Sequence, residues 1–393
     1  MTTENASRPC VAVLVFPFAA PSVLNFAGKL ACAMASVTTR TVLIGGGIAG
    51  DTGLPHNVQI LDVGVRMHYL KEKRPKWLSA LLWIAKAVLA QIRFAQKIVQ
   101  LQHEVDVVVC SLGCYYQLPV TMARLLGKKV MCASTGIDSR GTKVNYGSLL
   151  AALTSLLTWF DFAMSQAILV ESLRLGTCKE LAEFRPKLCD GALFLEDQDR
   201  FQSHTSIEDR ENVVGYIGRL TAEKGVLEFI QAIPIALRQR PDLHFTIIGT
   251  GLLDETVETV LHAAPWASHV TWLKWVAHEH IPDHLNRLKL AVVPSCSEGL
   301  PNLVLEAMGC GTPVLATGIG GIPDLINDGE TGFLLKDNAP DTIAQCIVHL
   351  VGDPRLGTVA LKARALVEQH YSLDAASRRY QRILHTLMED PER

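Results

Sequence analysis

Short apolar runs alternate with longer amphipathic segments along most of the chain. The runs at 11–16, 41–44 and 290–293 consist mainly of Val, Leu, Ile and Ala, and each is followed at once by Gly or Pro. Apolar runs of this length are typical of strands that are buried on both faces of a sheet. Further strands are expected at 106–110, 129–132, 167–170, 213–217, 243–248, 270–273 and 313–317. Strands that alternate with helices predict an α/β fold with parallel sheets that carry helices on both faces.

The chain is too long for a single hydrophobic core, so its 393 residues are expected to form two domains. A polar stretch at 196–212 is interpreted as the linker between them. The predicted domains are 1–205 and 206–369, and the last helix is expected at 373–388.

The most informative stretch is Ser295-Cys-Ser-Glu298-Gly-Leu-Pro301-Asn-Leu-Val-Leu-Glu306-Ala-Met-Gly, which follows an apolar run. Pro301 suits the first turn of a helix, so Glu298 lies in a loop at the carboxyl end of a parallel strand. Open α/β sheets bind ligands at that edge, and the start of the helix that carries Glu306 favours phosphate. The two carboxylates indicate a ligand with both hydroxyl and phosphate groups. The alternative is a helix-start Glu without a ligand and a second, solvated Glu.

A second motif, Gly218-Arg219-Leu-Thr-Ala-Glu-Lys224-Gly225, follows the run at 213–217. Its two cations can face a diphosphate at the carboxyl end of the strand. The alternative is a basic pair on a solvated helix start, but cations are unfavourable near a helix N-terminus unless an anion joins them. Gly249 and Gly251 follow the next strand, where glycine allows the backbone to approach a ligand closely.

Together these motifs resemble the retaining GT-B glycosyltransferases, in particular glycosyltransferase family 4. The resemblance is close over 213–335 and architectural in the N-terminal half. It implies two Rossmann-like domains that face each other across a central cleft, with a crossover helix at 370–393 returning to the N-terminal domain. It also implies that Glu298 contacts the hydroxyls of the donor sugar and that Arg219 and Lys224 stabilise the leaving diphosphate. No metal and no cofactor are then expected, and the co-substrate is a nucleoside-diphosphate-sugar.

The resemblance assigns the rest of the donor site by position. Glu306 would hold the ribose of the nucleotide, and the main chain near Val276 would bracket the base, whereas Trp275 is expected to pack. The remaining donor-site residues that it implies are Gly218, Gly249, Gly251, Gly299, Leu300, Pro301, Asn302 and Leu303.

The N-terminal half departs from the family pattern. Ala19-Ala20-Pro21 stands where a double-glycine turn is usual, and Thr135-Gly136 stands where a His-Gly is usual. These departures concern the acceptor side and leave the donor side intact. Thr135 and Asp138 are the candidate acceptor residues.

The segment at 76–101 places Lys86, Arg93 and Lys97 on one helical face, and apolar residues occupy the other faces. A broad apolar face with a cationic stripe is typical of a helix that lies at a membrane surface. The alternative is an ordinary sheet-covering helix whose basic stripe faces water. A second apolar patch at 148–160 favours the membrane surface.

Composition narrows the remaining classes of function. The net charge of −2 gives no basic excess for nucleic-acid binding. The ten scattered cysteines are interpreted as reduced thiols, and a signal segment is not expected from the pattern of the first residues. Asp197-Gln198-Asp199 matches the metal motif of another glycosyltransferase fold, but it lies in the predicted linker. We therefore expect a cytoplasmic enzyme, peripheral on the cytoplasmic face of a membrane.

The expected reaction is retaining transfer of a sugar to a hydroxyl acceptor, with a membrane-associated glycolipid or a lipid-linked precursor of a cell-surface glycan favoured. A soluble sugar or polysaccharide acceptor on the same fold is the first alternative. A non-catalytic partner subunit that binds sugar-nucleotide is the second.

Overall fold

The computed structural model describes residues 8–17, 21–47, 54–67, 76–111, 115–134, 148–174, 181–191, 194–195, 197–299 and 301–389. The chain divides into two compact units. Unit 1 comprises Met1–Ala192 and Asp374–Arg393, and unit 2 comprises Leu193–Leu373.

Unit 1 is built on a parallel sheet with the strand order β3-β2-β1-β4-β5-β6-β7 among the described residues. Its central strands are apolar and buried along their whole length, as parallel strands covered on both faces must be. The strands are β1 (Cys10–Val15), β2 (Arg40–Gly45), β3 (Val58–Asp62), β4 (Val107–Ser111), β5 (Lys129–Ser134), β6 (Ala167–Val170) and β7 (Leu188–Asp190).

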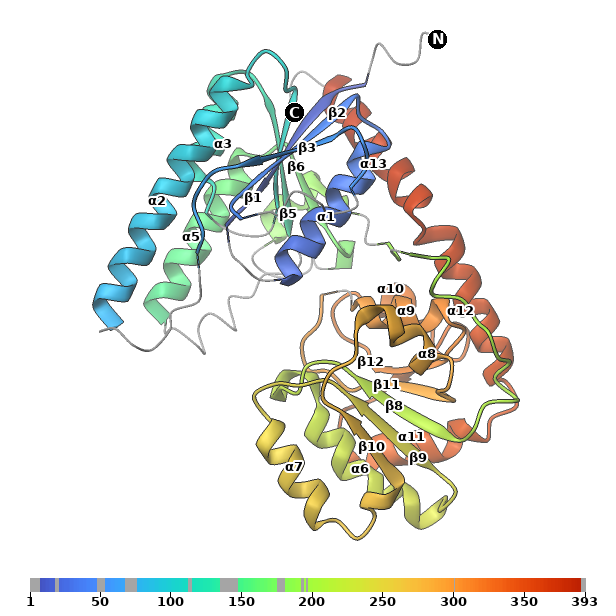
Figure 1. The fold of residues 1–393 in the computed structure, drawn as a ribbon. Helices are drawn as coiled ribbons and strands as arrows, with labels where there is room; N and C mark the ends of the chain where they lie inside the picture. The colour runs from blue at the N-terminus through green and yellow to red at the C-terminus, as the bar shows by residue number, and fades with distance from the viewer. Residues whose placement is uncertain are drawn as a thin grey trace. The chain divides into compact units, whose positions relative to one another are not determined.

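Helices cover both faces of this sheet (Figure 1). On one face, α2 (Lys76–Gln100) packs on α3 (Gln117–Leu125), which packs on α5 (Ser148–Met164). Two side chains join the three helices. The side-chain oxygen of Gln91 accepts a hydrogen bond from Leu118 N at 2.9 Å, and the amide of Gln117 donates to Leu157 O at 3.2 Å. The other face carries α1 (Pro21–Ala35).

The last helix, α13 (Leu373–Glu389), belongs to unit 1 although the residues before it belong to unit 2. Ser36 Oγ at the end of α1 donates to Ser377 Oγ at 2.6 Å, and Tyr380, Leu384 and Leu387 are buried. The prediction that the C-terminal helix returns to the N-terminal domain is therefore confirmed.

Unit 2 is built on a second parallel sheet, with the strand order β10-β9-β8-β11-β12-β13. The carboxyl ends of all six strands meet at one edge of this sheet, because the strands are parallel. The strands are β8 (Val213–Ile217), β9 (His244–Ile248), β10 (Val270–Leu273), β11 (Leu290–Val293), β12 (Val314–Thr317) and β13 (Phe333–Leu335).

Two apolar clusters hold the helices of unit 2 to its sheet. One packs α6 (Val226–Gln239) and α11 (Pro340–Val351) on one face through Phe229, Ile233 and Ile347. The other packs α8 (Ile281–Leu285), α9 (Asn302–Gly309) and α12 (Leu356–His370) on the opposite face through Leu285, Met308 and Val367. Two further helices are α7 (Asp254–Ala263) and α10 (Ile322–Leu325).

The polar stretch at 196–212 is not an open linker in the residues that the structure describes. Phe201 and Ile207 are buried in unit 2, and the guanidinium of Arg210 is buried as well. The limit between the units lies at 192/193 by their contacts, whereas the sequence placed it at 205/206. Polar composition indicated solvent exposure, but a few apolar side chains and one arginine are enough to dock this segment. Among the described helices, none has the length and apolar character that crossing a bilayer requires.

Candidate active site

Three loops of unit 2 begin at the carboxyl ends of neighbouring strands and are hydrogen-bonded to one another. After β8, Gly218 N donates to Ile248 O at 2.9 Å and Leu220 N donates to Thr250 O at 3.1 Å, which ties this loop to the one after β9. After β11, Cys296 N donates to Glu223 O at 2.8 Å. The two sequence motifs and the glycines predicted for the donor site therefore share one edge of the sheet.

The glycines after β9 allow the loops to approach this closely. Gly249 has φ +138°, and a Cβ on it would lie 1.9 Å from Gly218 O. A Cβ on Gly251 would lie 2.4 Å from Leu220 O. The sequence predicted close approach to a ligand, and the contact that the structure records is between two backbone segments. A side chain at either position would push the loop after β8 away from the loop after β9.

Lys224 and Glu298, the two residues in the centre of this edge, form an ion pair. Lys224 Nζ lies 2.7 Å from both carboxylate oxygens of Glu298, whose side chain is only 7% exposed. Ser295 Oγ also donates to Glu298 Oε1 at 2.7 Å. Next to Lys224, Gly225 has φ +70° and packs closely against Pro294, where a Cβ would lie 2.1 Å from the carbonyl oxygen of Pro294. The carboxylate is thus held in one orientation by three hydrogen bonds.

Arg219 is not part of this ion pair. Its side chain is 70% exposed and lies 3.6 Å from the carboxylate of Glu223. Its backbone is fixed, because the Tyr216 hydroxyl donates to Arg219 O at 2.8 Å, and burial raises the pKa of that hydroxyl. The structure therefore brings Lys224 and Glu298 together and leaves the guanidinium of Arg219 in solvent.

The helix that follows Glu298 begins without a side-chain cap. Pro301 is the N-cap residue of α9, and this cap position makes no side-chain hydrogen bond to the first turn of the helix. The loop before it is fixed by Gly321 N, which donates to Gly299 O at 2.6 Å. Asn302 is exposed and Leu303 is half-buried, while Leu300 lies outside the described residues. The first turn of α9 therefore offers N–H groups of the kind that bind phosphate.

Glu306 lies on the second turn of α9 and has a partner that the sequence did not reveal. His278 Nε2 lies 3.0 Å from Glu306 Oε1, and the imidazole stands beside the ring of Phe201 at a centroid distance of 5.5 Å. Glu306 is only 8% exposed, whereas the side chain of His278 is 61% exposed. His278 could have been suspected, because it follows β10 at the same edge of the sheet.

The segment after β10 differs in one respect from its prediction. Trp275 was expected to pack, but it is 77% exposed. Val276 is half-buried against the cluster that contains α9. The indole that does pack is Trp272, whose Nε1 donates to Gly249 O at 3.1 Å.

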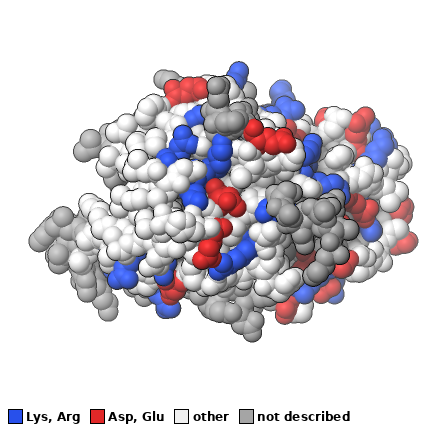
Figure 2. All heavy atoms as spheres, turned by 90° about the horizontal axis from the view of Figure 1, so that it is seen from above, with Lys and Arg blue, Asp and Glu red and all other residues white. Residues whose placement is uncertain are grey.

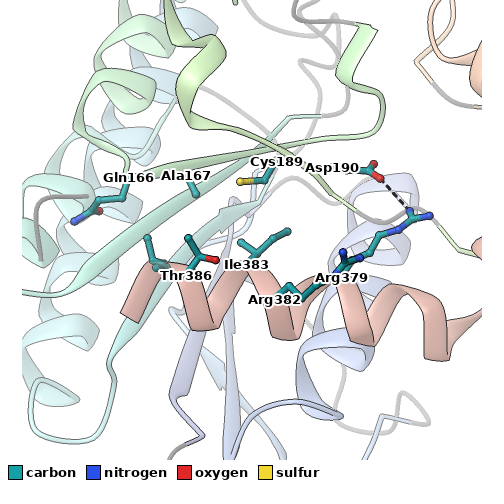
Figure 3. A pocket seen from close by; sticks show the side chains of 9 residues that line it. Gln166, Ala167, Cys189, Asp190, Arg379, Arg382, Ile383 and Thr386 are labelled. Atoms are coloured by element: carbon teal, nitrogen blue, oxygen red, sulfur yellow. Dashed lines mark ion pairs between the residues drawn. The ribbon is translucent and has the colours of Figure 1, made fainter. Parts of the chain in front are cut away.

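The predicted acceptor residues, Thr135 and Asp138, lie outside the described residues. Unit 1 instead shows a cavity of about 360 Å³ between α13 and the strands β6 and β7 (Figure 3). Arg379 projects from α13 into it and pairs with Asp190 at 3.3 Å. None of the residues predicted for the active site lines this cavity. Within the described ranges, no cluster of three or more His, Cys, Asp or Glu is arranged to hold a metal.

Comparison with known proteins gives a family match for part of unit 2 and a fold for the whole chain. Residues 211–353 match the family model of glycosyl transferases group 1. The crystal structure of Anabaena Alr3699/HepE in complex with UDP superposes on 96% of this chain and 100% of its own with a TM-score of 0.71, at 17% identity. The fold is therefore GT-B, which confirms the predicted architecture of two Rossmann-like domains. The segment at 211–353, which lies within unit 2, is therefore similar to the group 1 glycosyltransferases.

Two relatives differ in how much of the chain they match. An alpha-D-kanosaminyltransferase from Streptomyces kanamyceticus is 34% identical over 171 residues, which are 43% of this chain and 44% of that protein. A GDP-mannose-dependent alpha-(1-6)-phosphatidylinositol monomannoside mannosyltransferase from Mycolicibacterium smegmatis is 27% identical over 342 residues, which are 79% of this chain and 87% of that protein. The first match thus spans less than half of the kanosaminyltransferase, and the second spans most of the mannosyltransferase.

Proposed function

We propose that this enzyme transfers a sugar, with retention of configuration, from a nucleoside-diphosphate-sugar to a hydroxyl of a lipid-linked acceptor. The observation that carries the donor half of this proposal is the half-buried pair of Lys224 and Glu298 beside the uncapped start of α9. A cation, a carboxylate and free N–H groups at one sheet edge match the phosphates and hydroxyls of a nucleotide-sugar.

Lys224 can serve two groups at once. An ammonium group has three N–H donors, and Lys224 directs its hydrogen bonds to the two oxygens of Glu298. The third N–H is available for a phosphate oxygen of the donor. The same contact that orients the carboxylate therefore places a positive charge where a diphosphate would leave, and Glu298 is left to accept hydrogen bonds from the sugar hydroxyls.

In the proposed reaction, the bond between the anomeric carbon and the diphosphate oxygen breaks as the acceptor oxygen bonds to the same face of the sugar. The leaving phosphate takes the proton of the acceptor hydroxyl. Lys224 and Arg219 stabilise the negative charge that develops on the diphosphate, so the reaction requires no metal and no cofactor. Arg219 is 70% exposed, and it reaches this position only by leaving Glu223.

The rest of the donor site is proposed from position. Glu306, with His278 beside it, binds the ribose, and the main chain near Val276 borders the base. The backbone of Gly218, Gly249, Gly251, Gly299, Pro301, Asn302 and Leu303 is proposed to border the diphosphate. Leu300 is assigned to the same group by its place in the sequence motif alone, because it lies outside the described residues.

A lipid-linked acceptor is favoured over a soluble one by the mannosyltransferase relative, whose name specifies a phosphatidylinositol mannoside and which aligns with 79% of this chain. A soluble acceptor remains the alternative, because the kanosaminyltransferase matches only 43% of the chain. The third hypothesis is a non-catalytic partner subunit that binds the sugar-nucleotide. It is disfavoured because the pair of Lys224 and Glu298 is intact.

The proposal is tested first by thermal unfolding with UDP-, GDP- and ADP-sugars, since a ligand that binds only the folded protein raises the melting temperature. The sugar that shifts the transition is then incubated with the enzyme, and the anomeric configuration of the product or of the hydrolysed sugar is read by NMR. Retained configuration and turnover in EDTA are expected. Inverted configuration would overturn the proposed mechanism, and binding without any turnover would favour the partner subunit.

A further inference from the structure

The exposed apolar residues of the described chain are concentrated on three helices of unit 1. The outer surface of α2, α3 and α5 carries more than half of the large hydrophobic side chains that are exposed in this structure. These residues are Leu82, Ile84, Val88, Leu89, Ile92 and Val99 on α2, Leu118 and Leu125 on α3, and Leu153, Leu156 and Trp159 on α5. We call these residues the α2–α3–α5 surface.

The exposed apolar residues of α2 are not the ones that pack against the rest of unit 1. Ala87, Phe94 and Ile98 form the buried face of the helix, whereas Ile84 and Val88 are 53% and 50% exposed. An amphipathic helix that only covers a sheet needs one apolar face. The sequence left open whether the apolar faces of this helix are covered, and the structure answers that a second apolar face is exposed to solvent.

Helical geometry places this second face toward the neighbouring helices. Gln91 bonds to Leu118 of α3, and it shares a flank of α2 with Ile84 and Val88 because residues three and seven apart lie on one side of a helix. Lys86, Arg93 and Lys97 lie together on the opposite flank. The exposed apolar residues of α2 therefore continue into those of α3, and the cations form a rim.

The charge of this surface has one sign. The only acidic residue of the three helices is Asp161, which is buried, although the whole chain has 39 acidic and 37 basic residues. Arg124 on α3 adds to the cations of α2. In Figure 2 uncharged side chains cover most of the left part of the view, the side on which α2 and α5 lie in Figure 1.

We propose that the α2–α3–α5 surface lies on an anionic lipid membrane, with its aliphatic side chains and Trp159 among the acyl chains and its cations against the headgroups. An apolar centre with a cationic rim and no exposed acid matches an anionic bilayer. A second copy of this chain would bring two cationic rims together with no acid to pair them. The role of this membrane contact rests on the proposed function, because the enzyme would meet a lipid-linked acceptor at a membrane surface.

The test is co-sedimentation of the full chain with vesicles of phosphatidylglycerol and phosphatidylcholine, compared with vesicles of phosphatidylcholine alone. Binding is expected only to the anionic vesicles, and high salt should weaken it. A variant with Lys86→Gln, Arg93→Gln and Lys97→Gln should bind about a hundredfold more weakly, since each cation near the headgroups contributes roughly a factor of five.

A second variant removes apolar area and keeps the charge, with Ile84→Gln, Val88→Gln and Leu156→Gln, and it should also lose vesicle binding. The matched control changes exposed apolar residues elsewhere, Leu361→Gln and Met388→Gln, and should bind as the unchanged protein does. Circular dichroism melting of each variant verifies folding.

Three outcomes would overturn the proposal. They are no binding of the unchanged protein to anionic vesicles, equal loss in the control variant, and a dimer in sedimentation velocity that Ile84→Gln disperses. Failure of the transferase proposal would be seen separately, because a Lys224→Ala chain without turnover should still bind vesicles.

Discussion

Among single residues, Lys224 has the most direct proposed link to the chemistry. Of the two cations in the second motif, only Lys224 places its charge next to Glu298, the residue proposed to bind the sugar, at a distance of 2.7 Å.

We expect Lys224→Ala to lower kcat by about a hundredfold, because one preorganised donor to a leaving group is worth about 3 kcal/mol. KM for the donor should change much less. Steady-state rates of transfer or donor hydrolysis measure both quantities, and Lys362→Ala, an exposed lysine on α12, is the control. Full activity of Lys224→Ala would refute the leaving-group assignment.

Arg210 is a residue whose importance the sequence did not indicate. Its guanidinium donates to the carbonyl oxygens of Leu288 and Cys310, each at 2.9 Å, and to Thr312 Oγ1 at 2.8 Å. Burial lowers its pKa to about 10, so it stays charged at neutral pH. It thereby joins the segment before β8 to the end of α9.

We expect Arg210→Met to destabilise the protein by about 3–5 kcal/mol, because it leaves several buried carbonyl groups without a donor. Arg210→Lys should recover only part of that loss, since an ammonium group cannot replace the planar fork of guanidinium donors. Urea unfolding monitored by circular dichroism measures the effect, with the exposed Arg238→Met as the control. An unchanged unfolding midpoint for Arg210→Met would mean that these hydrogen bonds make no net contribution to the free energy of unfolding.

The role of a single residue could be predicted from the sequence only where the residue lies in a local sequence motif. Lys224 and Glu298 lie in recognisable motifs, so the sequence singled them out, although it could not show that they pair across 74 positions. The contact of His278 with Glu306 joins different loops, and no local pattern encodes it. Trp275 was misjudged because a large aromatic side chain usually packs, and here Trp272 fills that role.

At the scale of elements, the central strands were predictable, whereas three of the four edge strands were not. β6, β8, β10 and β11 have the bounds that the apolar runs predicted. β3, β7 and β13 were not predicted, and each lies at the end of a sheet. Edge strands are short and half-exposed, as the burial of β3 and β7 shows, so they lack the continuous apolar run that marks a central strand.

The contact between α5 and α3 contains a buried carboxyl group. Asp161 Oδ2 accepts hydrogen bonds from Tyr116 N at 3.2 Å and from the amide of Gln117 at 3.0 Å, so it caps the start of α3 from another helix. Its Oδ1 is buried without a hydrogen-bond partner. Burial raises the pKa of Asp161 to about 8, so the group is protonated in the folded protein at neutral pH.

This carboxyl group should make stability depend on pH in a defined direction. Between pH 4 and 8 the unfolded chain has lost the proton that the folded chain keeps, so stability falls as pH rises, by at most about 1.4 kcal/mol per unit. The contribution is fully present below pH 4 and is lost by about pH 8. Asp161→Asn should flatten the decline and raise the melting temperature at pH 8. Melting curves at several pH values test this, and an equal slope in the variant would contradict it.

At the scale of the whole molecule, the number of units and the return of α13 were predictable from length and from the resemblance to GT-B proteins. The limit between the units was harder, because the segment at 196–212 is polar in composition yet docks on unit 2 through Phe201, Ile207 and Arg210. The acceptor side was least predictable. Its candidate residues, Thr135 and Asp138, carry no motif of the family and lie outside the described residues.

The account depends on a nucleotide-sugar that binds to unit 2 at the edge where Lys224, Glu298 and Glu306 lie. Calorimetric titration of UDP, GDP and ADP into the unchanged enzyme and into Glu306→Gln tests this most directly. One nucleotide should bind the unchanged enzyme, and Glu306→Gln should weaken it about tenfold to a hundredfold, since a charge-assisted hydrogen bond contributes about 1.5–3 kcal/mol. The control Glu368→Gln on α12 should bind as tightly as the unchanged enzyme. Equal affinity of Glu306→Gln, or no binding of any of the three nucleotides, would contradict the account.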